Sequence, residues 1–241
     1  MVEVPNLGKM SRRKLILLSG ASAIAASLTP QLLKSPMAIA ETNPQAAFSN
    51  LTPDQSIKKL MDGNQRYFQH KRIFPDQSPA RVTELAKGQH PFAIVLGCAD
   101  SRVSPELLFD QGLGNLFDIR VAGNIINDAV LGSIEYAILE LKTPLIFVLG
   151  HERCGAVTAA VNGKSLPGKI GTLVAAIKPA VDQVKNQPGD KVDNAVRANI
   201  KMSVNKLKST SSILSEAMKS GKLKIVGGRY DLDTGKVDMI T

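Results

Sequence analysis

Two continuous apolar segments, PFAIVLG at 91–97 and PLIFVLG at 144–150, constrain the fold of this chain most. Neither segment alternates polar and apolar residues, which is typical of strands covered on both faces and therefore of parallel sheets. Segments 115–123 and 222–231 are also predicted strands. Helical patterns at 104–112 and 127–142 separate the first three strands. We therefore predict an α/β fold, a single domain with a central, mainly parallel β-sheet flanked by helices.

Helix signals flank these strands on both sides. Thr52 followed by Pro53 predicts a helix over 53–70, and Ser78 predicts a second helix that stops at Gly88. Ser104 is the predicted cap of the helix over 104–112. After the third strand we predict a short helix at 155–163 and a long helical region at 170–220, interrupted by the STSS sequence at 209–212.

The first 40 residues have the pattern of an export signal. A charged SRRKL sequence precedes an apolar stretch of small and aliphatic residues, and AIA at 38–40 is a small-residue cleavage site. The paired arginines resemble a twin-arginine signal, which exports folded proteins. We predict cleavage after Ala40, a polar tether at 41–51 and a domain at 52–241. The protein is then exported to a periplasm, extracytoplasmic space or equivalent lumen.

The apolar stretch argues against a membrane anchor, and the charge distribution argues against a nucleic-acid partner. An uncleaved membrane anchor is the alternative to a signal, but the stretch is too short and too rich in Ser and Gly. No later segment approaches the roughly 18 continuous apolar residues of a membrane span, so we expect none after processing. The formal net charge is +9, but the basic residues are spread along the chain. We therefore predict no nucleic-acid partner.

Both cysteines of the chain follow predicted buried strands. Cys98 follows the strand at 91–97, whereas His151 and Cys154 follow the strand at 144–150. Ligands of a parallel sheet bind outside the carboxyl ends of its strands, so these side chains converge if the two strands are neighbours. Two thiolates and an imidazole suit Zn²⁺ and leave a fourth position for water or substrate. The alternative is a Cys98–Cys154 disulfide, expected in an oxidising compartment, in a non-catalytic binding protein.

A carboxylate and a guanidinium follow the first cysteine closely. Asp100 and Arg102 lie two and four residues beyond Cys98. An arginine can hold a carboxylate in fixed bidentate geometry, and a carboxylate held in this way can orient a nucleophile or bind the metal itself. The alternative is a surface ion pair that caps the helix at 104–112.

These residues carry a family resemblance. The pattern C-x-D-x-R followed by H-x-x-C-G resembles the signature of β-class carbonic anhydrases, and RVAGN at 120–124, GSIEYAILELK at 132–142 and VGGRYDLDTGKV at 226–237 resemble further segments of that family. The resemblance implies one zinc ion per chain on Cys98, His151 and Cys154, with Asp100 as a conditional ligand. It also implies a catalytic pair, Asp100 and Arg102, and reversible hydration of CO₂ to bicarbonate and a proton by zinc-bound hydroxide.

The resemblance implies a substrate site and an assembly as well. By similarity, Gln89, Phe117 and Tyr136 form the CO₂ pocket, and Gly155 offers a backbone N–H to substrate. Val95 stands where the closed, bicarbonate-regulated form of the family has Trp, which favours the open form. The family suggests a homodimer or tetramer with an N-terminal helical arm. Hydrolysis of carbonyl sulfide or carbon disulfide on the same fold is the alternative activity.

Overall fold

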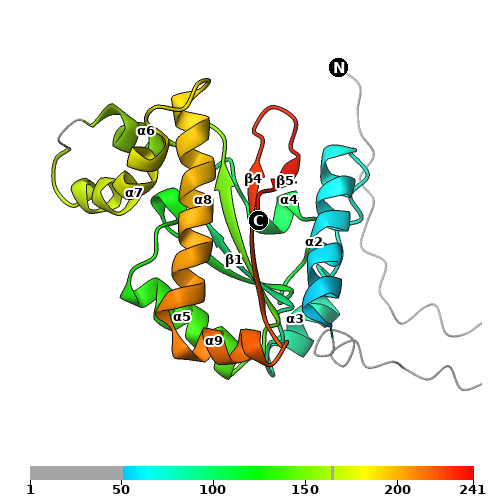
Figure 1. The fold of residues 1–241 in the computed structure, drawn as a ribbon. Helices are drawn as coiled ribbons and strands as arrows, with labels where there is room; N and C mark the ends of the chain where they lie inside the picture. Colours follow the sequence, from blue (N-terminus) through cyan, green and yellow to red (C-terminus); the bar gives the residue numbers. More distant parts are fainter. Residues whose placement is uncertain (1–50, 164–165) are drawn as a thin grey trace, which may run out of the picture. The chain divides into compact units, whose positions relative to one another are not determined.

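A five-stranded sheet forms the centre of the computed structural model, which describes residues 51–163 and 166–241. The strand order is β2-β1-β3-β4-β5 (Figure 1). Four strands are parallel, and the last is antiparallel to β4. The strands are β1 (Ala93–Gly97), β2 (Leu116–Arg120), β3 (Leu145–His151), β4 (Lys224–Tyr230) and β5 (Val237–Met239). The predicted mainly parallel α/β sheet is confirmed, and only β5 was not predicted.

The two continuous apolar segments are neighbours in the sheet. Every residue of β1 and of β3 is buried, as expected for strands covered on both faces. Gly97, at the end of β1, pairs with Leu149 of β3, so the two strands finish side by side. Cys98 follows Gly97 directly, and His151 is the last residue of β3. The sheet therefore delivers both predicted ligand segments to one edge.

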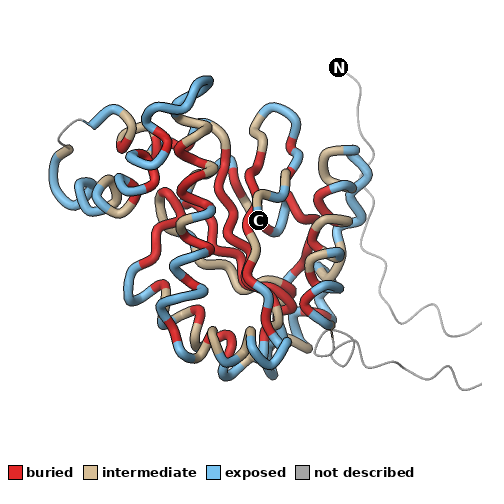
Figure 2. Tube along the Cα trace, viewed as in Figure 1, coloured by how far each residue is buried: buried red, intermediate tan, exposed pale blue. Residues whose placement is uncertain are grey.

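Helices cover the two faces of the sheet with separate apolar clusters. One cluster includes residues of five helices: α5 (Asp128–Leu139), α6 (Gly155–Asn162), α7 (Ile170–Val184), α8 (Lys191–Thr210) and α9 (Ser212–Lys219). The other includes residues of α2 (Pro53–Phe68) and of the one-turn helix α4 (Pro105–Leu108). In Figure 1 α8 and α2 lie on opposite sides of the strands, and Figure 2 shows the buried strands between the exposed outer surfaces of these helices. Two further short segments are α3 (Pro79–Leu85) and the 3₁₀ turn η1 (Ala122–Asn124).

Helix boundaries follow the predicted caps, with a correction at Ser104 and a second break in the region predicted at 170–220, between the end of α7 at Val184 and the start of α8 at Lys191. Thr52 forms a reciprocal capping box with Gln55, and the Ser78 hydroxyl accepts a hydrogen bond from the backbone of α3. Ser211 separates α8 from α9, within the STSS sequence. Ser104, in contrast, makes no side-chain capping bond, because its hydroxyl donates to the Glu106 carboxylate instead. The helix predicted over 104–112 is accordingly only four residues long.

The export signal at 1–40 and the tether, apart from Leu51, lie outside the described residues. Within the part of the chain that the structure describes, no helix combines the length and apolar character needed to cross a membrane.

Candidate active site

The two cysteines and His151 meet at the carboxyl edge of the sheet. Cys98 follows β1, His151 ends β3 and Cys154 precedes α6. One ligand atom from each lies within 4.8 Å of the others, and all three residues are buried. The two Sγ atoms are 3.9 Å apart and both cysteines are free. The disulfide alternative is therefore wrong, because the thiols approach each other without a bond.

His151 has one satisfied ring nitrogen and one unsatisfied nitrogen. Its Nδ1 lies 2.9 Å from the Glu152 carbonyl oxygen, an acceptor, so Nδ1 carries the proton and Nε2 keeps its lone pair. Nε2 is buried and has no hydrogen-bond partner. A buried polar atom without a partner costs free energy, and this one faces two cysteine sulfurs. A metal ion that accepts nitrogen and sulfur ligands fits this donor set.

The two neighbouring thiols differ in acidity, because the pKa of one is lowered and the pKa of the other is raised. The hydrogen bond with Cys154, together with the nearby His151 side chain and the Gly123 N–H, lowers the pKa of Cys98 to about 4 despite its burial. The same hydrogen bond with Cys98, together with burial, raises the pKa of Cys154. One thiolate is therefore favoured at neutral pH even without a metal, and thiolates are the metal-binding form of cysteine.

Asp100 and Arg102 form the predicted bidentate pair. The Arg102 Nε and Nη2 atoms donate to Asp100 Oδ1 and Oδ2 at 2.9 and 2.8 Å, and the Arg102 backbone N–H also donates to Oδ1. These bonds from Arg102 hold the pKa of Asp100 well below its usual range, so the carboxylate is ionised. Asp100 Oδ2 lies 3.8 Å from His151 Nε2. The pair thus borders the ligand cluster and is not confined to the surface of α4.

Two supports of the first ligand segment were missed by the sequence analysis. Arg120, at the end of β2, donates to the carbonyl oxygens of Cys98 and Asp100 at 3.0 and 2.6 Å. Gly123, in η1, donates its backbone N–H to Cys98 Sγ at 3.3 Å. Both residues lie in the RVAGN sequence, which was assigned to the family but given no role. Its position directly after a strand was the signal that could have identified them.

Charged contacts with the β4–β5 hairpin support the second ligand segment. Arg153, which lies between the ligands, forms a two-bond ion pair with Asp233 at 2.9 and 2.6 Å. Glu152 accepts a hydrogen bond from the backbone N–H of Leu232 and donates its own N–H to the Tyr230 carbonyl. The short hairpin therefore holds the turn that carries His151 and Cys154.

The predicted substrate residues occupy two separate places in one chain. Gly155 begins α6 beside the ligands, is exposed, and has open space where a Cβ would lie. Gln89 is in an exposed segment before β1. Phe117 pairs with Ile94, so at about 3.3 Å per residue it lies about 13 Å along the sheet from Cys98. The half-exposed Tyr136 ring is 6.4 Å from the Phe117 ring. A single chain thus brings only Gly155 to the cluster.

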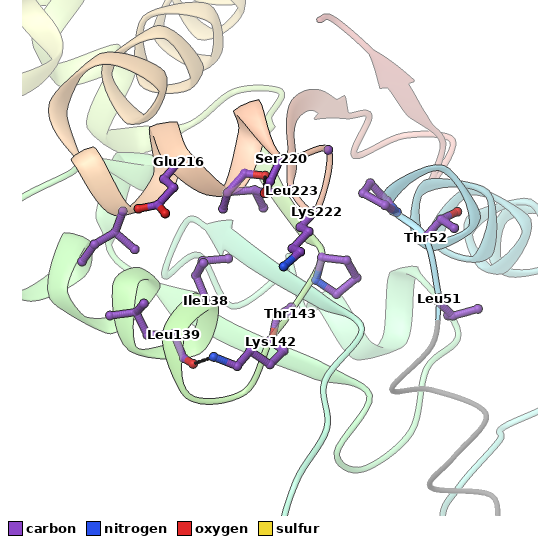
Figure 3. A pocket seen from close by; sticks show the side chains of 15 residues that line it. Leu51, Thr52, Ile138, Leu139, Lys142, Thr143, Glu216, Ser220, Lys222 and Leu223 are labelled. Atoms are coloured by element: carbon purple, nitrogen blue, oxygen red, sulfur yellow. Dashed lines mark hydrogen bonds between the residues drawn. The ribbon is translucent and has the colours of Figure 1, made fainter.

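A cavity of about 600 Å³ lies at the opposite, amino edge of the sheet. Figure 3 shows its wall, formed where α5 leads into β3 and α9 leads into β4, with Leu139 and Leu223 among the apolar side chains. Lys142 and Lys222 are also in the wall, but the Lys142 ammonium donates to the Leu139 carbonyl. Within the described ranges, no potential metal-binding cluster includes these residues. The size of this cavity therefore does not identify it as the reaction site.

Comparisons with known proteins agree with this geometry. A family model described as carbonic anhydrase matches residues 93–237. Carbonic anhydrase 2 of Mycobacterium tuberculosis is 43% identical over 191 residues, which cover 78% of this chain and 92% of that protein. The β-carbonic anhydrase CcaA has a similar structure, with a TM-score of 0.62 at 29% identity over 76% of this chain and 94% of CcaA.

Two tetrameric β-carbonic anhydrases of Sordaria macrospora share the fold at 23% identity, with a TM-score of 0.64 over 76% of this chain and 96% of the matched chain. The matched segment includes every residue of the ligand cluster, and the parallel sheet agrees with that of the solved structures. The chain belongs to the carbonic anhydrase family, in its β class.

Proposed function

We propose that this carbonic anhydrase hydrates CO₂ reversibly, to bicarbonate and a proton, at one zinc ion held by Cys98, His151 and Cys154. One observation carries the proposal: the unpartnered, buried Nε2 of His151 lies among two free thiols whose chemistry favours a thiolate. The intact family pattern supports the reaction. No observation favours carbonyl sulfide or carbon disulfide as the substrate.

Zinc bound to this donor set would act as a Lewis acid and lower the pKa of water towards neutrality. Asp100 orients the attacking water by accepting its hydrogen bond on Oδ2, the oxygen nearest to His151. Arg102 donates to both carboxylate oxygens and so keeps Asp100 oriented towards Arg102, which supports the expected open form. Asp100 would be free to serve as a conditional metal ligand only if these bonds from Arg102 were broken.

The product site lies at the start of α6. The Gly155 N–H is in the first turn of that helix, where the backbone N–H groups point outward and the helix dipole favours negative charge. Bicarbonate accepts a hydrogen bond there while CO₂, which is neutral, gains less. Gly155 therefore positions the oxygen that becomes negative as the product forms.

The apolar part of the substrate site comes from a second copy of the chain. Phe117 lies about 13 Å along the sheet from Cys98 of its own chain, the Tyr136 ring packs near Phe117, and Gln89 precedes the amino end of β1. Tyr136 is 50% exposed although it is a large aromatic residue, as expected for a side chain that a partner covers. We therefore propose a homodimer, or a tetramer built from such dimers, with one zinc site for each chain.

The mature enzyme is exported. The twin-arginine-like sequence at 12–13 and the AIA sequence at 38–40 support cleavage after Ala40 and export of the folded, zinc-loaded chain. Replacing both Arg12 and Arg13 by Lys should retain the unprocessed protein inside the cell. Cell fractionation and mass measurement of the amino terminus test this, and an unchanged exported, shortened protein would contradict it.

Metal analysis coupled to a hydration assay tests the central proposal. The wild-type protein should contain about one zinc ion per chain and hydrate CO₂ in a stopped-flow assay. Cys98→Ser should lose both the zinc and the activity, whereas the control His90→Ala, at an exposed histidine, should keep both. Full CO₂ hydration by zinc-free wild-type protein, or zinc and activity retained in Cys98→Ser, would overturn the assignment.

A further inference from the structure

The Gly123 backbone has a conformation that depends on its surroundings. Its φ of 73° is in the left-handed region, and its N–H donates to Cys98 Sγ. A Cβ at this position would lie 2.6 Å from Cδ1 of Ile177 in α7. The backbone angle favours glycine here, and a larger residue would also have to displace the end of the Ile177 side chain. The conformation of the turn therefore fixes the direction of the Gly123 N–H that donates to Cys98.

A polar side chain from a distant helix holds the same residue. Asn199, in α8, is only 2% exposed, and its Nδ2 donates to the Gly123 carbonyl oxygen at 2.9 Å. This bond spans 76 positions in the chain. Gly123 is thus held at both polar groups, because its N–H is bonded to Cys98 and its carbonyl to Asn199. A rotation of the turn would break both bonds.

Asn199 and Ser203 are the two polar residues among the buried residues of α8. The residues around Asn199 in the buried stripe are mainly apolar: Ala195, Val196, Ala198, Ile200 and Val204. An apolar side chain would continue the stripe but would leave the buried Gly123 carbonyl without this donor, which costs more than a hydrogen bond contributes. The contact with Gly123 therefore accounts for an amide in this position.

We propose that Asn199 is a positioning residue of the metal centre, which acts through Gly123 on the sulfur of Cys98. A backbone N–H that donates to a thiolate draws negative charge from the sulfur, so its orientation adjusts how strongly that sulfur binds a metal. The inference rests on the proposed metal site and adds a residue that does not touch the metal. Groups that orient metal ligands typically change metal affinity about 10- to 100-fold when they are removed.

Cobalt substitution provides the test, because the thiolate-to-cobalt absorption band reports directly on the sulfur ligands. Asn199→Leu removes the donor with little change of side-chain volume. Asn199→Ser has a smaller side chain, which is too short to reach the Gly123 carbonyl. Both variants should shift the band and weaken Co²⁺ binding about 10-fold in a chelator competition. The matched control Asn205→Leu, at an exposed position of the same helix, should change neither property.

The outcomes separate the two proposals. If wild-type protein binds no Co²⁺ or Zn²⁺, the proposed metal site fails and the inference fails with it. If wild-type protein binds Co²⁺ and a folded Asn199 variant has the same band and the same affinity, only the role of Asn199 is overturned. Circular dichroism identifies which variants are folded. If Asn199→Leu does not fold, the absorption band and Co²⁺ affinity of Asn199→Ser decide the role of Asn199.

Discussion

The two loops that carry the metal-binding side chains are held in different ways. The loop after β1, residues 98–103, is held by N–H donors from β2 and η1 that bond to its carbonyl oxygens and to its cysteine sulfur. The loop after β3, residues 152–154, is held to the β4–β5 hairpin by the exposed Arg153–Asp233 ion pair and by two hydrogen bonds between Glu152 and the hairpin backbone. Exposed ion pairs stabilise proteins little, whereas bonds to partly buried backbone groups stabilise them more. We therefore expect substitutions around the first loop to have the larger effects.

The largest effect is expected at the reacting end of the first loop. Asp100→Asn keeps the shape of the side chain but removes the negative charge that Arg102 holds. We expect kcat/KM for CO₂ hydration to fall by about 10²-fold or more, the usual contribution of an acid–base group, while the zinc content stays unchanged. The control is Asp62→Asn, a half-exposed carboxylate on α2. An unchanged rate would remove Asp100 from the mechanism.

A pH-dependent effect on stability is expected in β2, the strand that supports the first loop but not the second. Burial, and then the neighbouring Glu106 carboxylate, raise the pKa of Asp118 to about 8. Because an unfolded Asp titrates near pH 3.9, the folded state holds an extra proton between about pH 4 and pH 8, and stability falls as pH rises through that range. Asp118→Asn carries no such charge and should be more stable than wild type at pH 8.

Denaturant unfolding at pH 5 and pH 8 measures this effect. The advantage of Asp118→Asn should be large at pH 8 and should shrink towards pH 5, where wild-type Asp118 is protonated. Asp182→Asn, at an exposed carboxylate of α7, should show no such pH dependence. Equal differences at the two pH values would contradict the raised pKa.

A smaller effect is expected at Arg120. Arg120→Met keeps an unbranched, flexible stem but removes both donors to the carbonyl oxygens of Cys98 and Asp100. We expect kcat/KM to fall about 10-fold, the size associated with groups that orient metal ligands. A stopped-flow hydration assay, with the zinc content as a parallel measurement, checks the prediction. A loss of less than twofold would mean that the first loop keeps its shape without β2.

The smallest effect is expected in the second loop. Arg153→Ala removes the pair with Asp233, in which both side chains are at least half exposed. Because solvent screens such pairs, we expect CO₂ hydration to change by less than about twofold and the unfolding midpoint to stay within error. A loss as large as that of Arg120→Met would show that the two loops depend equally on their supports and would break the comparison.

The sheet was predictable because local patterns determine it. Continuous apolar segments identify buried parallel strands, and the ligand residues follow two of them directly, so the meeting of Cys98 with His151 and Cys154 could be expected from residue order. Strand β5 was missed because it has only three residues and its pairing with β4 depends on a hairpin, not on an apolar pattern of its own.

The supports of the site were not predictable in the same way. Asn199 donates to a residue 76 positions away, and Arg120 to residues 20 and 22 positions away, and no local periodicity reports such contacts. The pocket residues were assigned by resemblance alone, and one chain leaves Gln89, Phe117 and Tyr136 away from the cluster. In the proposed dimer these residues would converge across the interface, and the periodicity of a single chain does not encode such an arrangement.

The origin of the ligands from two strand ends has a consequence for folding. Cys98 and His151 are separated by more than 50 residues, and a metal that binds both closes that whole segment into a loop. Such a closure lowers the entropy of any state in which the segment is unfolded, by an amount that grows with the logarithm of its length. A ligand that binds only the folded chain also stabilises it by mass action. The proposed zinc ion would therefore also act as a removable cross-link, and chelation should lower the thermal midpoint of the protein as well as its hydration rate.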